Sequence, residues 1–258
     1  MDVRNNGGGS LGEAISLTGL FIKDGPVVQV KYSNGQVNIN EDEDSSVFWD
    51  KPLVVMTNRL SASASEIFAG AIKDYNRGLV IGDTTYGKGT VQTFRELPFG
   101  SLKLTFAMFY RVNGMSTQHK GVEPHIFLNS FFKHDKLGES SLDYALPFNQ
   151  IPAPKIKALT AFAPSWIYKL KNIQLKELEQ NENWQATFDA ITAEREEKES
   201  VSLNIETRKK QSSDRKTKSE EILKDLDLEE DSNLYDYANE INLDQTLNII
   251  SNWLNEQK

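Results

Sequence analysis

The chain of 258 residues carries a formal net charge of −8, contains 38% hydrophobic residues and has no cysteine. This length allows one or two domains with a buried core, and the absence of cysteine excludes disulfides, thiolate catalysis and cysteine metal ligands. Binding to nucleic-acid phosphates requires a surplus of Lys and Arg, which a chain of negative net charge lacks, so we expect no nucleic-acid partner. No apolar run reaches the roughly 18 to 20 residues of a membrane span, so we expect no integral membrane segment.

The first half of the chain alternates strand-like and helix-like segments. It opens abruptly on a glycine turn at 7–9 and an apolar pattern that begins a helix at Ala14. The patterns then predict strands at 26–32 and 52–58, a helix at 65–75, and strands at 78–83, 90–97 and 101–112. Strand, helix and strand in close succession form a βαβ unit, so we predict an α/β fold here.

The composition changes near residue 150, after which Lys, Glu, Asn, Gln and Leu predominate. Helical spacing occurs at 165–181, 183–200 and 243–258, and the run 207–219 has almost no apolar residue and is predicted to be mobile. Prolines at 147, 152 and 154 mark a linker, so we divide the chain into a core at 1–146 and a helical accessory region at 147–258. Three tryptophans are expected to anchor the helices of this region: Trp166, Trp184 and Trp253.

Two patterns could indicate a cofactor, and neither is convincing. Residues 82–90, "GDTTYGKGT", nearly match a phosphate-binding loop, but Gly89 stands where the magnesium-binding hydroxyl belongs, and a strand-like segment follows instead of a helix. The histidines have no metal-ligand spacing and are interpreted as ordinary loop or surface residues: His119, His125 and His134. We therefore expect no cofactor and no metal, and interpret the glycines as bringing Lys88 close to another backbone.

The segment "NRLSASASEIFAG" sets serines between a strand end and a helix start, where unpaired backbone N–H groups favour a developing oxyanion. A catalytic serine needs a base, and with no suitably placed histidine the candidate is Lys88, at the end of the next strand of the βαβ unit. The alternative is structural, with the serines as helix caps and the lysine as a solvated loop residue, and spacing alone favours it.

Three long segments resemble the signature segments of the C-terminal processing peptidases: "RNNGGGSL", "NRLSASASEIFAGAIKDYNRGLVIGDTTYGKGTVQ" and "FYRVNGMSTQHKGVEPHI". In the second half, "IPAPKIKALTAF" and "VSLN" are similar to the helical C-terminal region of such a protease. The resemblance implies a crotonase-like serine protease core, present here in part, and a Ser-Lys dyad. It also implies protein or peptide substrates recognised by nonpolar C-termini through a PDZ domain, an adaptor protein, and a periplasmic or cell-envelope location.

The resemblance assigns the nucleophile to Ser63 and the base to Lys88, assisted by Gln92. Lys88 and Gln92 alternate with Thr90 along a strand and so face the same side, which makes a joint role reasonable. The oxyanion hole is assigned to backbone N–H groups of three small residues: Gly8, Gly9 and Ala64.

Four further residues are expected to support this site. Asp74 lies eleven residues beyond Ser63, about 16 Å along a helix, so we expect a structural carboxylate that pairs with Arg77 or a neighbouring loop. Glu66 is expected to favour the helix dipole, Thr85 to brace the lysine loop and Ser65 to cap the helix.

The chain lacks a signal peptide, a PDZ domain and an N-terminal helical region, so the sequence predicts a fragment of weak or no activity. Two alternatives remain open. One is a catalytically inactive scaffold or binding protein that keeps the fold, with Ser63 and Lys88 beyond hydrogen-bond distance. The other is a crotonase-like hydratase or thioesterase, which would need a basic acyl-CoA site that the sequence does not show.

Overall fold

The computed structural model describes residues 1–128, 132, 136–159, 161–182, 184–187, 189, 202–225 and 234–256. His134 and most of the predicted helix at 183–200 lie outside these residues. Packing divides the chain into two units, the first formed by Met1–Leu128 with Phe132–Ile167 and the second beginning at Tyr168.

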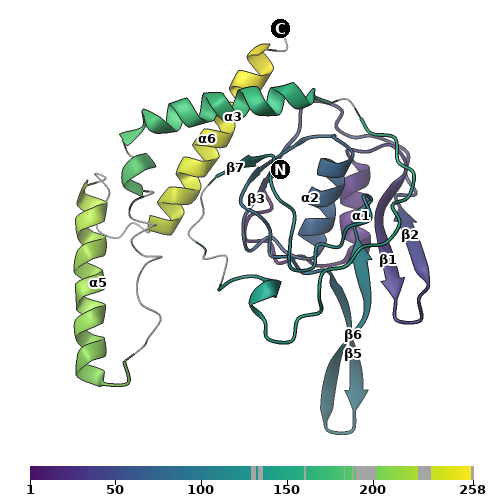
Figure 1. The fold of residues 1–258 in the computed structure, drawn as a ribbon, viewed down its shortest axis with the longest axis horizontal. Coiled ribbons are helices and arrows are strands. Elements are labelled where there is room, and N and C mark those ends of the chain that lie inside the picture. The colour runs from purple at the N-terminus through teal and green to yellow at the C-terminus, as the bar shows by residue number, and fades with distance from the viewer. Residues whose placement is uncertain are drawn as a thin grey trace. The chain divides into compact units, whose positions relative to one another are not determined.

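The first unit combines helices with two sheets, as Figure 1 shows, which confirms the predicted α/β class. One sheet has four strands in the order β2-β1-β6-β5, and the other has the three parallel strands β3-β4-β7. The elements are α1 (Leu11–Gly19), β1 (Pro26–Tyr32), β2 (Val37–Glu41), β3 (Val54–Thr57), α2 (Ala64–Asp74), β4 (Leu79–Gly82), β5 (Thr90–Leu97), β6 (Gly100–Tyr110) and β7 (Ile126–Phe127).

Strand β3, helix α2 and strand β4 form the βαβ unit that positions the site. Both strands are buried along their whole length, as expected of short apolar runs in a parallel sheet. The N-terminal segment extends this sheet, because Val3 N–H donates to Met56 O at 3.0 Å and Asp2 pairs with Met56 in parallel. The glycine turn at 7–9 is thereby brought beside the end of β3.

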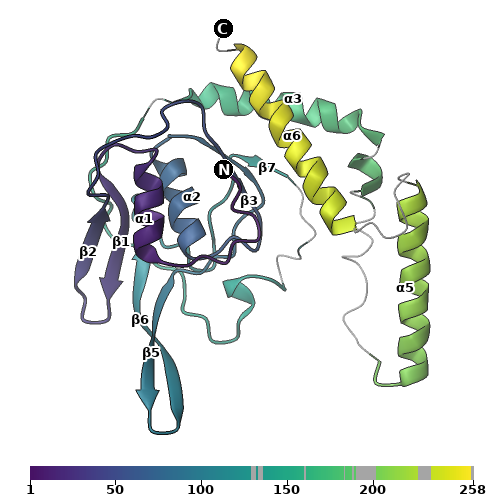
Figure 2. The ribbon, with the colours of Figure 1, turned by 180° about the vertical axis from the view of Figure 1, so that it is seen from behind.

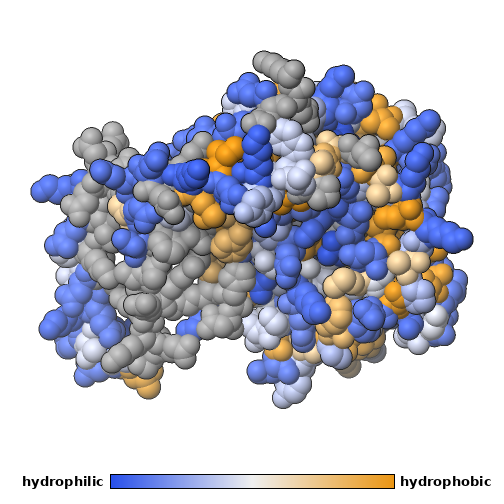
Figure 3. Space-filling model, turned by 45° about the horizontal axis from the view of Figure 1, so that its top comes forward, coloured by the Kyte–Doolittle hydropathy of each residue, from blue (hydrophilic) through white to orange (hydrophobic). Residues whose placement is uncertain are grey.

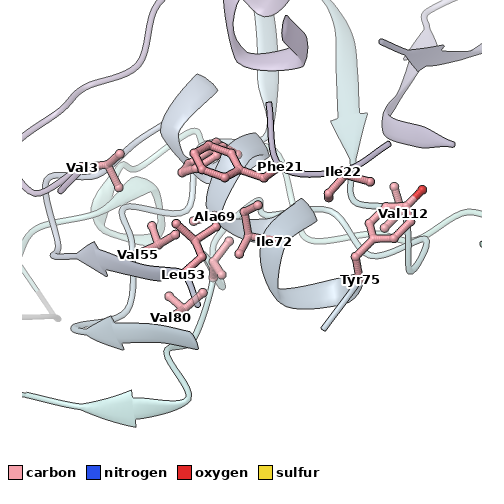
Figure 4. Packing of buried hydrophobic residues seen from close by; sticks show 12 residues of the cluster. Val3, Phe21, Ile22, Leu53, Val55, Ala69, Ile72, Tyr75, Val80 and Val112 are labelled. Carbon is pink, nitrogen blue, oxygen red and sulfur yellow. The ribbon is translucent and has the colours of Figure 1, made fainter. Parts of the chain in front are cut away.

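Helix α2 is buried along most of its length, from Ser65 to Ile72, because it packs against both sheets. One side joins the apolar cluster around β3 and β4, part of which Figure 4 shows, and the other side meets β1 and β6 through Ile67 and Ala71. A helix that is apolar on several faces is stable only when it is enclosed in this way. The N-terminus of α2 is thus held rigidly.

The segment with the three prolines packs on the first unit. Ser116 N–H donates to Asn149 O at 3.1 Å, Ile151 N–H to Gly114 O at 2.9 Å, and Leu159 N–H to Tyr75 O at 2.7 Å. These contacts explain why the first unit extends to Ile167, whereas composition places the boundary after residue 146.

Helix α3 (Pro164–Glu179) begins in the first unit and continues into the second, which also contains α5 (Ile205–Asp225) and α6 (Leu234–Glu256); Figure 2 shows these helices from behind. Trp253 is buried on α6, whereas Trp166 and Trp184 are half-buried. No helix among the described residues is long and apolar enough to span a bilayer.

The prediction of a mobile segment at 207–219 was wrong, because these residues lie within α5. Asn204 Oδ1 accepts from Glu206 N–H at 2.9 Å and from Thr207 N–H at 3.1 Å, which caps the helix. Ion pairs at i,i+3 and i,i+4 spacing add support, Glu206 with Lys209 and Lys216 with Glu220. A polar helix can therefore form without a wide apolar face, in keeping with the hydrophilic side chains that predominate on the surface in Figure 3.

Candidate active site

Ser63 occupies the N-cap position of α2, directly after the turn that follows β3. Its backbone has φ 57° and ψ −113°, a conformation that is rare for a residue with a side chain. Strain of this kind persists only where surrounding contacts enforce it, and it concentrates at functional sites. The side chain of Ser63 is half-buried and lines a pocket of about 330 Å³.

The flanking serines have a different role. Ser61 Oγ donates to Val3 O at 2.7 Å and accepts from Asn58 N–H at 3.0 Å. Ser65 Oγ donates to Asn6 O at 3.0 Å, so the prediction of Ser65 as the helix cap was wrong. Both serines attach the N-terminal segment to the turn that carries Ser63.

The glycine turn lies directly against the backbone around Ser63. Gly8 has φ 95°, and a Cβ at this position would lie 2.6 Å from Ala62 O and 2.8 Å from Ala64 N. Because Gly8 N–H already donates to Asn6 Oδ1 at 2.9 Å, we interpret Gly8 as the residue that lets the two backbones lie close together. Gly9 and Ala64 both line the pocket. Within the described residues their N–H groups have no hydrogen-bond acceptor, which leaves them available to a ligand.

Every backbone N–H of the lysine loop, residues 87–89, is hydrogen-bonded. Gly87 N–H donates to Glu66 Oε1 at 2.7 Å, and Lys88 N–H donates to Glu66 Oε2 at 2.9 Å. Gly89 N–H donates to Gln118 Oε1 at 2.8 Å. The loop is therefore fixed by side chains from two other segments.

The three carbonyl groups of the lysine loop are also satisfied. They accept, in chain order, from His119 N–H at 2.8 Å, Thr117 Oγ1 at 3.1 Å and Phe109 N–H at 2.9 Å. A backbone bonded at each donor and acceptor has little freedom, so the position of the Lys88 Cα is set at the pocket that Lys88 lines.

Glu66 is fully buried and joins the serine turn to the lysine loop. Oε2 accepts from Ser63 N–H at 2.8 Å as well as from Lys88 N–H, and Oε1 accepts from Thr85 Oγ1 at 2.6 Å as well as from Gly87 N–H. Burial raises the pKa of Glu66 to about 7, although these four hydrogen bonds favour the carboxylate. Beyond the dipole role expected from its place in the first helical turn, Glu66 connects the two halves of the site.

Thr85 also connects segments. Its hydroxyl donates to Glu66 and accepts from Val122 N–H at 2.7 Å. Arg59, at the turn after β3, donates to Thr85 O, and burial lowers the pKa of its guanidinium. Thr85 thus reaches the lysine loop through Glu66, and its expected role in bracing that loop stays a prediction.

The pocket brings Ser63, Lys88 and Gln92 together. The remaining lining consists of Gly9, Leu11, Ala64, Ile67, Thr90, Val91, Lys103 and Phe109. In the part of the chain that the structure describes, no hydrogen bond joins Ser63 Oγ to Lys88 Nζ, and the lysine forms no ion pair. Catalytic hydrogen bonds are often long without substrate and tighten in the complex. Gln92 donates to Thr105 Oγ1 at 3.4 Å, next to an irregularity in the β5–β6 register.

Asp74 lies outside the lining of this pocket and contacts the segment that follows β6. Arg111 holds its carboxylate with two hydrogen bonds, Nε to Oδ2 at 3.0 Å and Nη2 to Oδ1 at 2.5 Å, and Asn113 donates to Oδ1 at 3.1 Å. Burial raises the pKa of Asp74, and the Arg111 charge opposes that shift. The predicted pairing with Arg77 was wrong, because Arg77 donates to backbone carbonyls, including that of Phe21 at 2.8 Å. The neighbouring loop after β6 provides the partner instead.

The described residues contain no group of three or more His, Cys, Asp or Glu side chains that could hold a metal ion. The site therefore offers a hydroxyl, an amine and free backbone donors, which is an arrangement suited to acyl transfer.

Two family models match the chain in succession. Residues 1–128 match peptidase family S41, and residues 132–256 match the C-terminal domain of tail-specific protease. The chain belongs to peptidase family S41. This family consists of serine proteases, and the S41 match contains every residue of the pocket described above.

Individual proteins are similar to this S41 chain over part of their length. The tail-specific protease of Haemophilus influenzae is 48% identical over 162 residues, covering 59% of this chain and 23% of its own length. The chloroplastic C-terminal processing peptidase of Tetradesmus obliquus is 38% identical over 130 residues, 50% of this chain and 28% of its own. The solved photosystem II D1 C-terminal processing protease is 38% identical, with a TM-score of 0.44, over 50% of this chain and 33% of its own. The chain spans about a quarter of the length of these two curated relatives.

Sequence reasoning missed the residues that fix the lysine loop of this S41 chain from the far side. Thr117 and Gln118 lie in the segment "MSTQHKG", where the signal was a polar run between apolar segments. Glu139, which accepts from Gln118, lies outside all the segments that carried the resemblance. Nothing local in the sequence marks Glu139.

Proposed function

We propose that this chain carries the catalytic dyad of a serine endopeptidase, with Ser63 as nucleophile and Lys88 as general base. The observation that carries the proposal is that one buried carboxylate, Glu66, binds the backbone of both residues while both side chains line one pocket. The membership of family S41 supports the same reaction.

In the proposed reaction, neutral Lys88 takes the proton of Ser63 Oγ as this oxygen bonds to the carbonyl carbon of a peptide. The resulting oxyanion accepts hydrogen bonds from the N–H groups of Gly9 and Ala64. The Lys88 ammonium then gives its proton to the leaving nitrogen as the C–N bond breaks, which leaves an ester on Ser63. Water, activated by Lys88, attacks this ester, releasing the carboxylate product and restoring Ser63.

Gln92 assists from the same side of the pocket as Lys88. A hydrogen bond from its amide to the Lys88 amine or to the substrate backbone would orient the reacting groups, and its present contact to Thr105 is long enough to be exchanged.

The substrates are proteins recognised by nonpolar C-termini, by analogy with the tail-specific relative. The apolar part of the pocket supports this class, because Leu11, Ile67 and Phe109 offer a site for an uncharged side chain. We also propose a periplasmic or cell-envelope location and an adaptor protein, in keeping with the resemblance to the C-terminal processing peptidases.

The test uses the complete gene product and an unstructured substrate protein that ends in apolar residues. Ser63→Ala and Lys88→Ala are expected to abolish cleavage, while the controls Ser16→Ala and Lys31→Ala, at exposed positions outside the pocket, retain it. Near-normal turnover by either dyad variant would overturn the assignment. An inactive scaffold, the alternative suggested by the missing hydrogen bond between Ser63 and Lys88, predicts no cleavage by any of these proteins. The 258-residue chain alone is expected to cleave weakly or not at all.

A further inference from the structure

The segment 137–142 folds against the outer side of the lysine loop. Glu139 begins the 3-10 helix Glu139–Ser141, and its N–H donates to Tyr86 O at 3.1 Å, directly before the loop. Arg59 Nε donates to Leu137 O at 2.6 Å, which attaches the same segment to the turn after β3. Glu139 is 8% exposed, so its carboxylate lies within the first unit.

The Glu139 carboxylate reaches the lysine loop through one intermediate, the side chain of Gln118. Gln118 is fully buried, its Oε1 accepts from Gly89 N–H at 2.8 Å, and its Nε2 donates to Glu139 Oε1 at 3.2 Å. Gly89 directly follows Lys88 in the chain. A continuous chain of hydrogen bonds therefore runs from Glu139 to the residue beside the base.

The orientation of the Gln118 amide decides whether this series of hydrogen bonds can form. An amide has an acceptor end and a donor end of nearly the same shape, so it can be turned over at little steric cost. In the turned orientation its NH₂ group would face the Gly89 N–H, and two donors would oppose each other in a buried site. A carboxylate only accepts, so Glu139 binds the NH₂ end and selects the orientation that gives Gly89 an acceptor.

We propose that Glu139, acting through Gln118, is a positioning residue for Lys88. Glu139 lies in the part of the chain that matches the C-terminal domain of tail-specific protease, whereas the pocket lies in the part that matches family S41. The start of the C-terminal region is thus a component of the catalytic apparatus. The inference rests on the proposed function of Lys88 as base.

An exchange of charges between the two side chains tests this proposal. Gln118→Glu places two carboxylates against each other in a buried site, and its kcat is expected to fall on the order of tenfold or more because the base is displaced. The double variant Gln118→Glu with Glu139→Gln restores one acceptor for Gly89 N–H and one donor between the side chains. We expect its kcat to recover most of the loss. KM is expected to change little, since neither side chain lines the pocket.

Removal of the Glu139 carboxylate supplies a second comparison. Glu139→Ala removes the acceptor and is expected to lower kcat more than Glu139→Gln, whose amide oxygen can still accept from Gln118. Gln36→Glu introduces the same charge at an exposed turn and serves as the control with unchanged activity.

Hydrogen exchange provides a readout that does not depend on cleavage. In the complete gene product, peptides covering residues 87–89 are expected to exchange faster in Gln118→Glu and in Glu139→Ala, and to return toward the unmodified rate in the double variant. Unchanged kcat and exchange in Gln118→Glu, or failure of the double variant to recover either, would overturn the inference. If cleavage still depends on Ser63 in that case, the proposed function stands. Cleavage that does not depend on Ser63 would remove the proposed function, and this inference with it.

Discussion

Replacing Glu66 tests whether one carboxylate holds the serine turn and the lysine loop together. Glu66 is fully buried, and its oxygens accept from the backbone N–H groups of Ser63, Gly87 and Lys88 and from the Thr85 hydroxyl. Glu66→Ala would leave the buried Gly87 N–H and the part-buried N–H groups of Ser63 and Lys88 without this acceptor. At about 1–3 kcal/mol for each, the variant is expected to lose at least about 3 kcal/mol of folding free energy.

Glu66→Gln provides a graded comparison at nearly constant volume. Its amide oxygen is expected to accept from Ser63 N–H and Lys88 N–H, because the NH₂ group can then face the Thr85 hydroxyl, which is able to accept. Only the Gly87 N–H is opposed by a donor in this orientation. The expected loss of folding free energy is about 1–3 kcal/mol, smaller than for Glu66→Ala.

Thermal unfolding and peptide cleavage by the complete gene product measure these effects. A loss of about 3 kcal/mol lowers Tm by about 6 °C or more in a domain of this size. The kcat is expected to fall in both variants, because the relative position of nucleophile and base is no longer fixed. Glu43→Ala, at an exposed acidic loop, is the control. A Tm and kcat for Glu66→Ala equal to those of Glu43→Ala would refute the role of Glu66.

Three further predictions concern the titration of Glu66, the glycine turn and the Asp74–Arg111 pair. Because burial raises the pKa of Glu66 from 4.5 to about 7, the folded state binds its proton more tightly than the unfolded state. The free energy of unfolding should therefore fall by about 3 kcal/mol as pH rises from 4.5 to 7, and urea titrations of Glu66→Gln should lack this component; equal slopes would contradict it. Gly8→Ala forces a Cβ to within 2.6 Å of Ala62 O and should reduce kcat at least tenfold, whereas Gly7→Ala, with open space at that position, should be tolerated in the same cleavage assay. Asp74→Asn weakens the buried pair with Arg111 and should lower the free energy of unfolding by up to about 3–5 kcal/mol. The kcat of the folded protein should be preserved. A loss of kcat without a loss of stability would argue for a direct catalytic role of Asp74.

The fold could be predicted where local patterns determine it. The apolar runs of β3 and β4 and the spacing of α2 are local signals, and the structure places these elements as expected. The strand β2 was missed, because its alternating "VNINE" pairs with β1 across a short turn and has only one weakly apolar face. The failure at α5 has a similar cause, since capping and ion pairs stabilise it where apolar periodicity is absent.

The site could be predicted only in part. A rule of topology brought Lys88 near the serines, because successive strand ends of a βαβ unit lie close together. The choice of Ser63 and Lys88 over the structural alternative came from the resemblance to the C-terminal processing peptidases. The contacts that fix them, from Glu66, Gln118 and Glu139, depend on which buried polar atoms meet after folding. Neither hydrophobic periodicity nor secondary-structure propensity predicts which buried polar atoms come into contact.

The choice of neutral donors around Glu66 has a chemical reason. A buried carboxylate is usually stabilised by a cation, but a cation bound to Glu66 would also lie beside the Lys88 backbone and near its pocket. The four groups that donate to Glu66 are instead three backbone N–H groups and one hydroxyl. They stabilise the carboxylate with partial charges, although burial still raises its pKa, and none of them brings a second charged side chain to the Lys88 backbone. Strain at Ser63, about 1–3 kcal/mol for such a backbone conformation, is offset in part by the same carboxylate through its bond to the Ser63 N–H. One acidic residue thus contacts both the strained backbone of Ser63 and the loop of Lys88, and this is why its replacement tests both halves of the proposed site.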